Sequence, residues 1–151
     1  MFIKVLDDED YIMRRHTQLQ PFSRAHHQTL RLVRALKYGE QGWGDLRKSL
    51  GLAQASLMQH FAEEEAEFSI LADRLPEDHQ LIGLLAQMVS EHILIMAEVL
   101  GIIRSADDKG LSSYKTLGHM LAEHIAFEEQ VLFPCLEQCC LPHDVVPMVI
   151  S

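Results

Sequence analysis

The sequence lacks the features that define several protein classes. No stretch approaches the ~18 consecutive apolar residues of a membrane-spanning helix. The first ten residues, MFIKVLDDED, have no positive segment followed by an apolar one, so we expect no secretory signal peptide. Positive charge is scarce, because 13 Lys and Arg residues stand against 22 Asp and Glu residues and the net charge is −9. This balance disfavours nucleic acid and anionic membranes as partners.

Cysteine is scarce and confined to one place. Cys135, Cys139 and Cys140 are the three cysteines of the chain. An odd number in one short stretch does not make a disulfide framework, so the sequence favours reduced thiols in a cytoplasmic protein. Cys135 and Cys139 are four residues apart on a predicted helix and could form a redox switch. The alternative is that two of the thiols are small core residues and the third lies at the helix end.

The periodicity of β-strands is absent beyond a few residues, and the sequence predicts an all-α protein. The 151 residues, 48% of them hydrophobic, suffice for a single domain over 1–151 with its own core. Short connections make neighbouring helices antiparallel. We therefore expect an up-down-up-down four-helix bundle over about 21–140, with a short N-terminal lead and a C-terminal tail. The predicted helices cover about 21–38, 45–74, 78–104 and 111–139.

Each predicted helix has a stripe of residues at helical spacing that should face the bundle interior. The stripes are apolar except where histidine or glutamate interrupts them. On the helix over 78–104 the stripe consists of Leu81, Leu85, Met88, His92, Ile95 and Val99. On the helix over 111–139 it consists of Leu117, Leu121, His124, Glu128, Val131 and Cys135.

The interrupting residues form one metal-ligand pattern that occurs twice. Each copy has an isolated histidine and, on the next predicted helix, a histidine and a glutamate four residues apart. Residues four apart leave the same face of a helix about one turn from each other. Counting residues from the helix ends places both copies in one layer of the bundle. The pattern predicts a binuclear transition-metal site, with iron as the first candidate and with the ligands His26, His60, Glu64, His92, His124 and Glu128.

Taken alone, each of these residues has a simpler interpretation. A lone histidine on an apolar helix face is more often a core residue with satisfied hydrogen bonds. Glu64 lies in an acidic run that solvent could cover. The simpler interpretation fails for the set, because six residues of metal-binding type would share one interior layer by accident. Buried glutamate is also rare unless it is paired or bound to a cation.

Neighbouring residues leave some ligand choices open. His26 has apolar residues one turn away, whereas His27 has Ser23 and two arginines, so we expect His26 in the core and His27 on a wet face. Glu65 and Glu129 each follow a predicted ligand and point some 100° away from it. We expect them to be solvated or to support the ligands, although Glu129 could join the site if the last helix slips in register.

These residues lie in segments that resemble a known family. RRHTQLQPFSRAHHQTL, HFAEEE and EHIAFEEQVLFP resemble the hemerythrin-like, HHE cation-binding family, from about residue 14 to residue 138. The resemblance implies a four-helix bundle with a non-haem di-iron centre, two bridging carboxylates and terminal histidines, and it implies the same six ligands. Oxygen-carrying members have a further histidine where this chain has Met88 or Met96. Ala25 stands where the family usually has an acidic residue, which puts one hydrogen bond in doubt.

The missing histidine changes the expected chemistry. Two six-coordinate irons offer about twelve ligand positions. Four histidines, two bridging carboxylates and an oxo or hydroxo bridge fill about ten of them, so about two stay open. Open positions favour external ligands, oxidation or metal exchange over oxygen storage. Imidazole and carboxylate ligands also permit zinc or manganese.

The sequence thus favours a di-iron binding protein that senses or handles O2, NO or iron, with peroxide as a further small ligand. Whether the chain is an enzyme stays open. One alternative is a di-iron enzyme of the peroxidase or iron–sulfur repair type. Another is a helical interaction bundle whose metal is incidental. The apolar tail segment VVPMVI suggests either a surface for a homodimer or a separate protein partner, or a strap over the bundle.

Overall fold

The computed structural model describes residues 8–39, 42–105 and 111–141, and these residues form helices and short connections without any strand. The predicted all-α class is confirmed for this part of the chain. The tail segment VVPMVI lies outside the described residues. Four long helices carry the fold: α3 (Gln20–Tyr38), α4 (Trp43–Ala72), α5 (His79–Arg104) and α6 (Leu111–Phe127).

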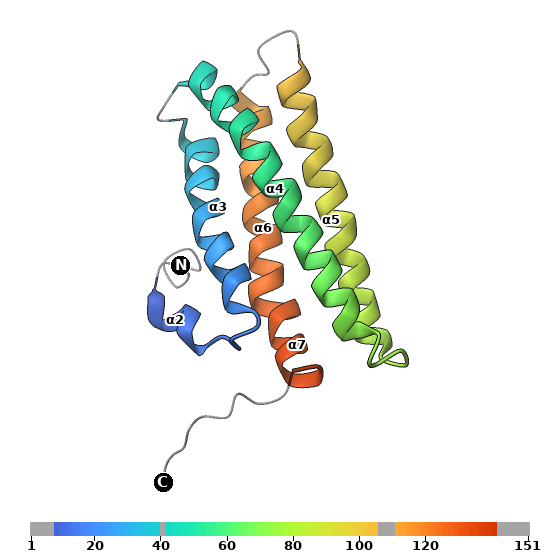
Figure 1. Ribbon diagram of the computed structural model, residues 1–151. Helices are drawn as coiled ribbons and strands as arrows, with labels where there is room; N and C mark the ends of the chain where they lie inside the picture. Colours follow the sequence, from blue (N-terminus) through green and yellow to red (C-terminus); the bar gives the residue numbers. More distant parts are fainter. Residues whose placement is uncertain (1–7, 40–41, 106–110, 142–151) are drawn as a thin grey trace.

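The four long helices lie side by side along a common direction (Figure 1). α3 and α4 are connected at one end of the molecule, and α4 and α5 at the other. α3 packs mainly against α6, and α4 mainly against α5. Every long helix therefore has a face toward the interior, and the middle of that face is where a shared site can form.

Local signals set where the helices begin and end. Gly39 ends α3 with a backbone φ of 61°, a left-handed conformation that glycine adopts without a Cβ clash. Asp78 caps α5, because its side chain accepts a hydrogen bond of 3.0 Å from the backbone N–H of Leu81. α4 begins at Trp43, two residues earlier than predicted.

Two clusters of buried apolar residues divide the interior along the helix axes. The first lies toward the α3–α4 connection and includes Leu30, Phe61 and Ile95. The second lies toward the α4–α5 connection and includes Phe68 and Met88. His26, Glu64 and His92 follow or precede members of the two clusters along α3, α4 and α5, whereas His60 stands between Leu57 and Phe61 of the first cluster. Apolar packing on both sides thus holds one polar layer in the middle of the bundle.

The fourth predicted helix is not one regular helix. α6 is followed by a π-helical segment, η1 (Glu128–Leu132), and then by α7 (Phe133–Cys139). A π-turn contains more residues than an α-turn, so it shifts the buried face of everything that follows. The prediction that Val131 belongs to the inner stripe is therefore wrong: Val131 is 46% exposed, and Leu132 and Phe133 are buried instead.

A short helix, α2 (Glu9–Arg14), precedes the bundle and was not predicted from the sequence. Asp8 caps it by accepting a hydrogen bond of 2.9 Å from the backbone N–H of Asp10. α2 packs beside α3 and buries Ile12. Six residues are too few to give a periodic signal, which is why this element escapes sequence analysis.

α5 is long and apolar enough to cross a membrane by length and composition, with a mean hydropathy of 1.5 over its best window. The expectation that no uninterrupted apolar run reaches this length still holds, because Glu91, His92 and Glu98 interrupt the helix, whereas an average tolerates such residues. One such helix is weak support for a membrane span, since a core helix passes the same test. Glu91 and His92 stand in the middle of α5 and contact other helices, which favours its place in the bundle.

Candidate metal centre

The structure brings all six predicted ligands into one buried layer. They form two groups of four residues that share both glutamates, and within each group one possible ligand atom per residue lies within 4.8 Å of all the others. We call the groups the α3–α4 position and the α5–α6 position, after the helices that supply their histidines. The α3–α4 position consists of His26, His60, Glu64 and Glu128, and the α5–α6 position of Glu64, His92, His124 and Glu128.

The choice between the two adjacent histidines of α3 follows from burial. His26 is 1% exposed and belongs to the α3–α4 position, whereas His27 is half-buried and belongs to neither group. The expectation that Ser23 lies on a wet face is wrong. Ser23 is buried, and its hydroxyl donates a hydrogen bond of 2.7 Å to Glu129.

The Nε2 atoms of the four histidines converge on the two shared glutamates. The distance from His26 Nε2 to Glu128 Oε1 is 2.7 Å, and that from His60 Nε2 to Glu64 Oε2 is 3.1 Å. His92 Nε2 lies 3.0 Å from Glu64 Oε1 and 3.6 Å from Glu128 Oε2. His124 Nε2 lies 3.3 Å from Glu128 Oε2. Each glutamate therefore reaches histidines of both positions, as a bridging carboxylate would.

Most of these converging atoms are buried without a hydrogen-bond partner, although several lie at contact distance. They are His60 Nε2, His92 Nε2, His124 Nε2, both carboxylate oxygens of Glu64, and Glu128 Oε2. A buried polar atom without a partner costs about 1–3 kcal/mol, and native proteins rarely keep several together. Metal cations bound in the two groups would satisfy these atoms. The residues present therefore fit metal cations.

The charges in the layer also suit cations. Burial opposes a charge on His26, yet hydrogen bonds with Glu128 and Glu129 raise its pKa well above the usual value. Burial likewise works against His92, but contacts with Glu128 and Glu64 raise its pKa to about 10. Burial would raise the pKa of Glu128, but His124 holds it well below the usual value. The carboxylates thus stay ionised, and their negative charge favours a positive charge on or beside the imidazole rings.

Three of the four imidazoles are also held from behind, at Nδ1, by a carboxylate. The Nδ1 atoms of His26, His92 and His124 each lie 2.7 Å from a glutamate oxygen. Such bonds fix the tautomer and the ring orientation and make Nε2 a better metal ligand. The three supporting residues are Glu129 for His26, Glu65 for His92 and Glu91 for His124.

Sequence reasoning found part of this support. Glu65 and Glu129 were expected to be solvated or to support the ligands, and both contact ligand histidines here. Glu91 was missed, although its place directly before His92 was a usable signal. Glu129 also answers the doubt raised by Ala25, because the carboxylate that bonds to the α3 histidine lies on η1 rather than on α3 itself.

α2 and the residue that follows it complete the surroundings of Glu129. Arg15 donates hydrogen bonds from NH2 to the Glu129 backbone carbonyl at 2.9 Å and to its Oε1 at 3.1 Å. The same atom donates to the Tyr11 hydroxyl at 2.7 Å, and Tyr11 donates to Glu129 Oε1 at 3.1 Å. Arg15 NH1 donates to Glu137 at 2.9 Å. No sequence pattern pointed to Tyr11 or Arg15.

The helices and the site together define a class: an all-helical protein with a paired histidine–glutamate site for metal cations. A family model described as the Hemerythrin HHE cation binding domain matches residues 17–136. The chain therefore belongs to the hemerythrin HHE cation-binding family, and the resemblance seen in the sequence is confirmed. Searches of curated proteins and of solved structures gave no match. Tyr11, Arg15 and Glu137 lie outside the matched residues.

Proposed function

We propose that the chain holds two non-haem iron ions, one at each position, and that it senses or handles O2, NO or iron. One observation carries the proposal: two groups of four ligands share Glu64 and Glu128, so the same two carboxylates serve both positions. In this proposal the helices form an up-down-up-down bundle around the site and all six predicted residues are ligands. Iron supplies a redox-active centre with about one open position on each ion.

The size of the cavities at the site supports a small ligand. Among the described residues, cavities of about 120 Å³ at His60, about 140 Å³ at His124 and about 240 Å³ at His92 each include one of the four histidines in their walls. Sites for drug-sized molecules are larger, from about 300 Å³ upward. O2, NO or peroxide would fit these cavities, whereas a bulky organic substrate would not. This favours binding and sensing over oxidation of a large substrate.

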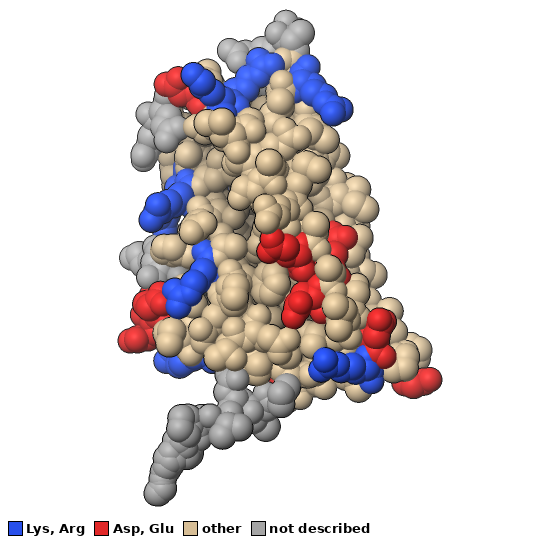
Figure 2. Space-filling view, in the orientation of Figure 1, with Lys and Arg blue, Asp and Glu red and all other residues tan. Residues whose placement is uncertain are grey.

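The surface supports the delivery of a cation. Figure 2 shows acidic side chains gathered over the middle of the face formed by α4 and α5, with most basic groups toward the ends and edge of the view. α4 contributes Glu63, Glu65 and Glu67, and the next basic residue after them is Arg74. A cluster of one sign raises the local concentration of ions of the other sign.

The cellular location of the protein and its partners also belong to the proposal. The acidic balance disfavours nucleic acid and anionic membranes as partners, and we place the protein in the cytoplasm. Ile82, Ile93 and Leu94 of α5 are exposed large apolar residues. Such side chains support a homodimer or a separate protein partner that would receive any signal.

Metal analysis of protein purified without added metal, paired with ultraviolet–visible spectra before and after air oxidation, tests the proposal. We expect about two irons per chain, one for each group of ligands, and a charge-transfer spectrum that appears on oxidation. O2, NO and peroxide would then be added in turn. A spectral change without turnover supports sensing, while steady consumption of peroxide would indicate an enzyme. Protein that contains no metal and takes up no Fe²⁺ anaerobically would refute the di-iron proposal.

A further inference from the structure

The two metal positions share both glutamates but differ in how their histidines are held. At the α5–α6 position both imidazoles are bonded at Nδ1 to carboxylates, His92 to Glu65 and His124 to Glu91. The His92 ring is also stacked on Phe61, with ring centroids 3.9 Å apart and an interplanar angle of 11°. These two rings are thus fixed by hydrogen bonding and, for His92, by packing.

At the α3–α4 position the support is weaker. The single carboxylate behind it, Glu129, also accepts hydrogen bonds from Arg15, Tyr11 and Ser23, so its charge is shared among several donors. Within this position His26 is held at Nδ1 by Glu129 and by the stacking of its ring on Phe133, so the weakly held imidazole is the other one, His60.

His60 is the exception among the four imidazoles. Within the described residues, no hydrogen bond reaches its Nδ1, and the residue is 12% exposed at its side chain. Its ring neighbours lie edge-on or tilted rather than parallel, with centroid distances of 5.3 Å to His26, 6.1 Å to Phe22 and 6.0 Å to Phe61. Neither a hydrogen bond at Nδ1 nor parallel stacking therefore holds this ring in place.

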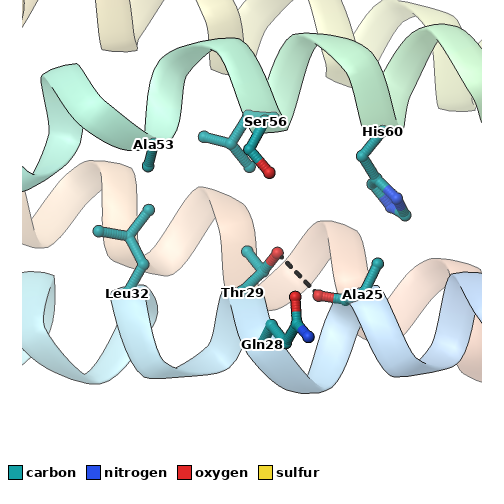
Figure 3. Close-up of a pocket in the computed structure, with 8 residues that line it drawn as sticks. Ala25, Gln28, Thr29, Leu32, Ala53, Ser56 and His60 are labelled. Atoms are coloured by element: carbon teal, nitrogen blue, oxygen red, sulfur yellow. Dashed lines mark hydrogen bonds between the residues drawn. The ribbon is translucent and has the colours of Figure 1, made fainter.

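A cavity lies directly beside this ring, between α3 and α4 (Figure 3). Its volume of about 120 Å³ exceeds the roughly 10–15 Å³ that one water needs. Gln28, Thr29 and Ser56 give it a polar wall without a charged side chain. The Thr29 hydroxyl donates to the Ala25 carbonyl at 3.0 Å and keeps its lone pairs available. The cavity gives the His60 ring space to move. Its oxygen atoms can contact a cation that leaves the site.

We propose that the α5–α6 position retains its ion, that the α3–α4 position exchanges its ion, and that the exchange passes through the cavity at His60. The inference rests on the proposed two-metal site and adds an order of release to it. The exchangeable cation is a divalent transition metal that accepts imidazole and carboxylate ligands. The His60 ring moves into the cavity and uncovers the ion, while Glu64 and Glu128 remain bound to the retained one.

A chelator challenge of the full chain loaded with Co²⁺ tests this inference. Co²⁺ accepts the same ligands, and its visible spectrum follows each ion as it leaves. After excess EDTA is added, we expect two phases of equal amplitude, one ion per chain in each. Glu91→Gln should speed the slow phase by about tenfold or more and leave the fast phase unchanged, because it removes a carboxylate from His124 only.

Ser56→Leu tests the route, because the larger side chain fills the cavity beside His60. We expect it to slow the fast phase by about tenfold or more, and to leave the slow phase unchanged. Ala62→Leu is the matched control, since Ala62 lines the cavity at His92 instead. Circular dichroism of each variant confirms that it is folded, and Glu91→Gln tests the order of release without touching the cavity.

The outcomes separate the two proposals. Release of both ions in one phase would overturn the inference while leaving the two-metal site intact. Acceleration of the fast phase by Glu91→Gln would reverse the assignment and overturn it as well. If Ala62→Leu slowed the fast phase and Ser56→Leu did not, the proposed route would be wrong. A chain that binds no Co²⁺ at all would refute the metal site and this inference together.

Discussion

Three of the four candidate ligand histidines have a carboxylate at each nitrogen of the ring. Nε2 of His26, His92 and His124 faces the shared glutamates, and Nδ1 of each faces a supporting carboxylate. Glu65 and Glu129 directly follow Glu64 and Glu128, the two shared glutamates, so each short acidic run supplies one carboxylate to the shared layer and one to Nδ1 of a histidine. A residue one position along a helix is about 100° around it, which lets neighbours serve different histidines.

Adjacent histidines on α3 provide a matched test of ligand identity. His26→Ala should lower the iron content and remove the ion of the α3–α4 position, because His26 is one of its two histidines. His27→Ala should leave the iron content unchanged, since His27 belongs to neither group. Metal analysis of both variants, purified side by side, checks this. Equal losses in the two variants would show that the iron does not depend on the buried ring.

The thiol of Cys135 gives a pH-dependent prediction. Burial raises its pKa, and the neighbouring Cys139 raises it further, to about 11. Only the thiolate is nucleophilic, and at pH 8 about one Cys135 thiol in a thousand is ionised. Alkylation by iodoacetamide should therefore rise about tenfold for each pH unit until the pH approaches 11.

Mass spectrometry that localises the label on Cys135 measures this rate. Cys139→Ser should speed the reaction, because it removes one cause of the raised pKa. Fast labelling of Cys135 at pH 8 would contradict the prediction and favour the redox switch. A protonated, partly buried thiol favours the other interpretation of the sequence, in which this cysteine fills space in the core.

At the scale of elements, the π-helical segment η1 decides how the last helix meets the site. Both Glu128 and Glu129 are buried at its start, one facing the shared layer and the other facing Nδ1 of His26. A π-turn spreads more residues around one turn, which brings adjacent side chains closer to a common face. Such segments are frequent at functional sites, and this one supplies, from consecutive residues, a carboxylate shared by the two groups and a carboxylate at Nδ1 of His26.

α2 is tied to the bundle by a buried charge. Arg15 is 9% exposed and contacts Glu129 and Glu137, so its removal leaves a buried carboxylate without its cation. Arg15→Ala should lower the free energy of unfolding by about 3 kcal/mol, as expected for breaking a buried ion pair. Urea unfolding measures the change. Arg14→Ala, at an exposed neighbouring position, should cost little; a similar loss in both variants would argue against a special role for Arg15.

At the scale of the whole molecule, metal binding and folding should be coupled. Residues from α3, α4, α5, α6 and η1 meet only when the bundle is formed, so the ions bind the folded chain far better than the unfolded one. An ion present at a hundredfold excess over its Kd stabilises the fold by about 2.7 kcal/mol. Anaerobic thermal unfolding with and without Fe²⁺ should therefore show a clear rise in Tm.

Two neighbouring glutamates of α4 test whether the rise in Tm depends on the candidate metal site. Glu64 is buried and shared by both positions, whereas Glu63 is exposed and accepts a hydrogen bond from Gln59. Glu64→Ala should abolish the rise in Tm, and Glu63→Ala should retain it. A rise that survives Glu64→Ala would mean that Fe²⁺ stabilises the protein at some other place.

Residue spacing along the chain was enough to predict the helical class and the layer that the six residues share. Helical periodicity is a local property: stripes such as Leu81 to Val99 depend only on residue spacing, and the same spacing puts His60 and Glu64 on one face. Bulk and polarity at each position were enough to separate His26 from His27.

Only the tertiary structure decided the features that depend on contacts between distant segments. The π-helical shift that exposes Val131 alters a helix without changing its composition. The hydrogen bond between His124 and the Glu91 carboxylate and the contact of Arg15 with Glu129 join elements that lie far apart in the chain. The unequal support of the two metal positions belongs to the same group. A hydrogen bond across a bundle has no fixed sequence spacing, so periodicity carries no signal for it.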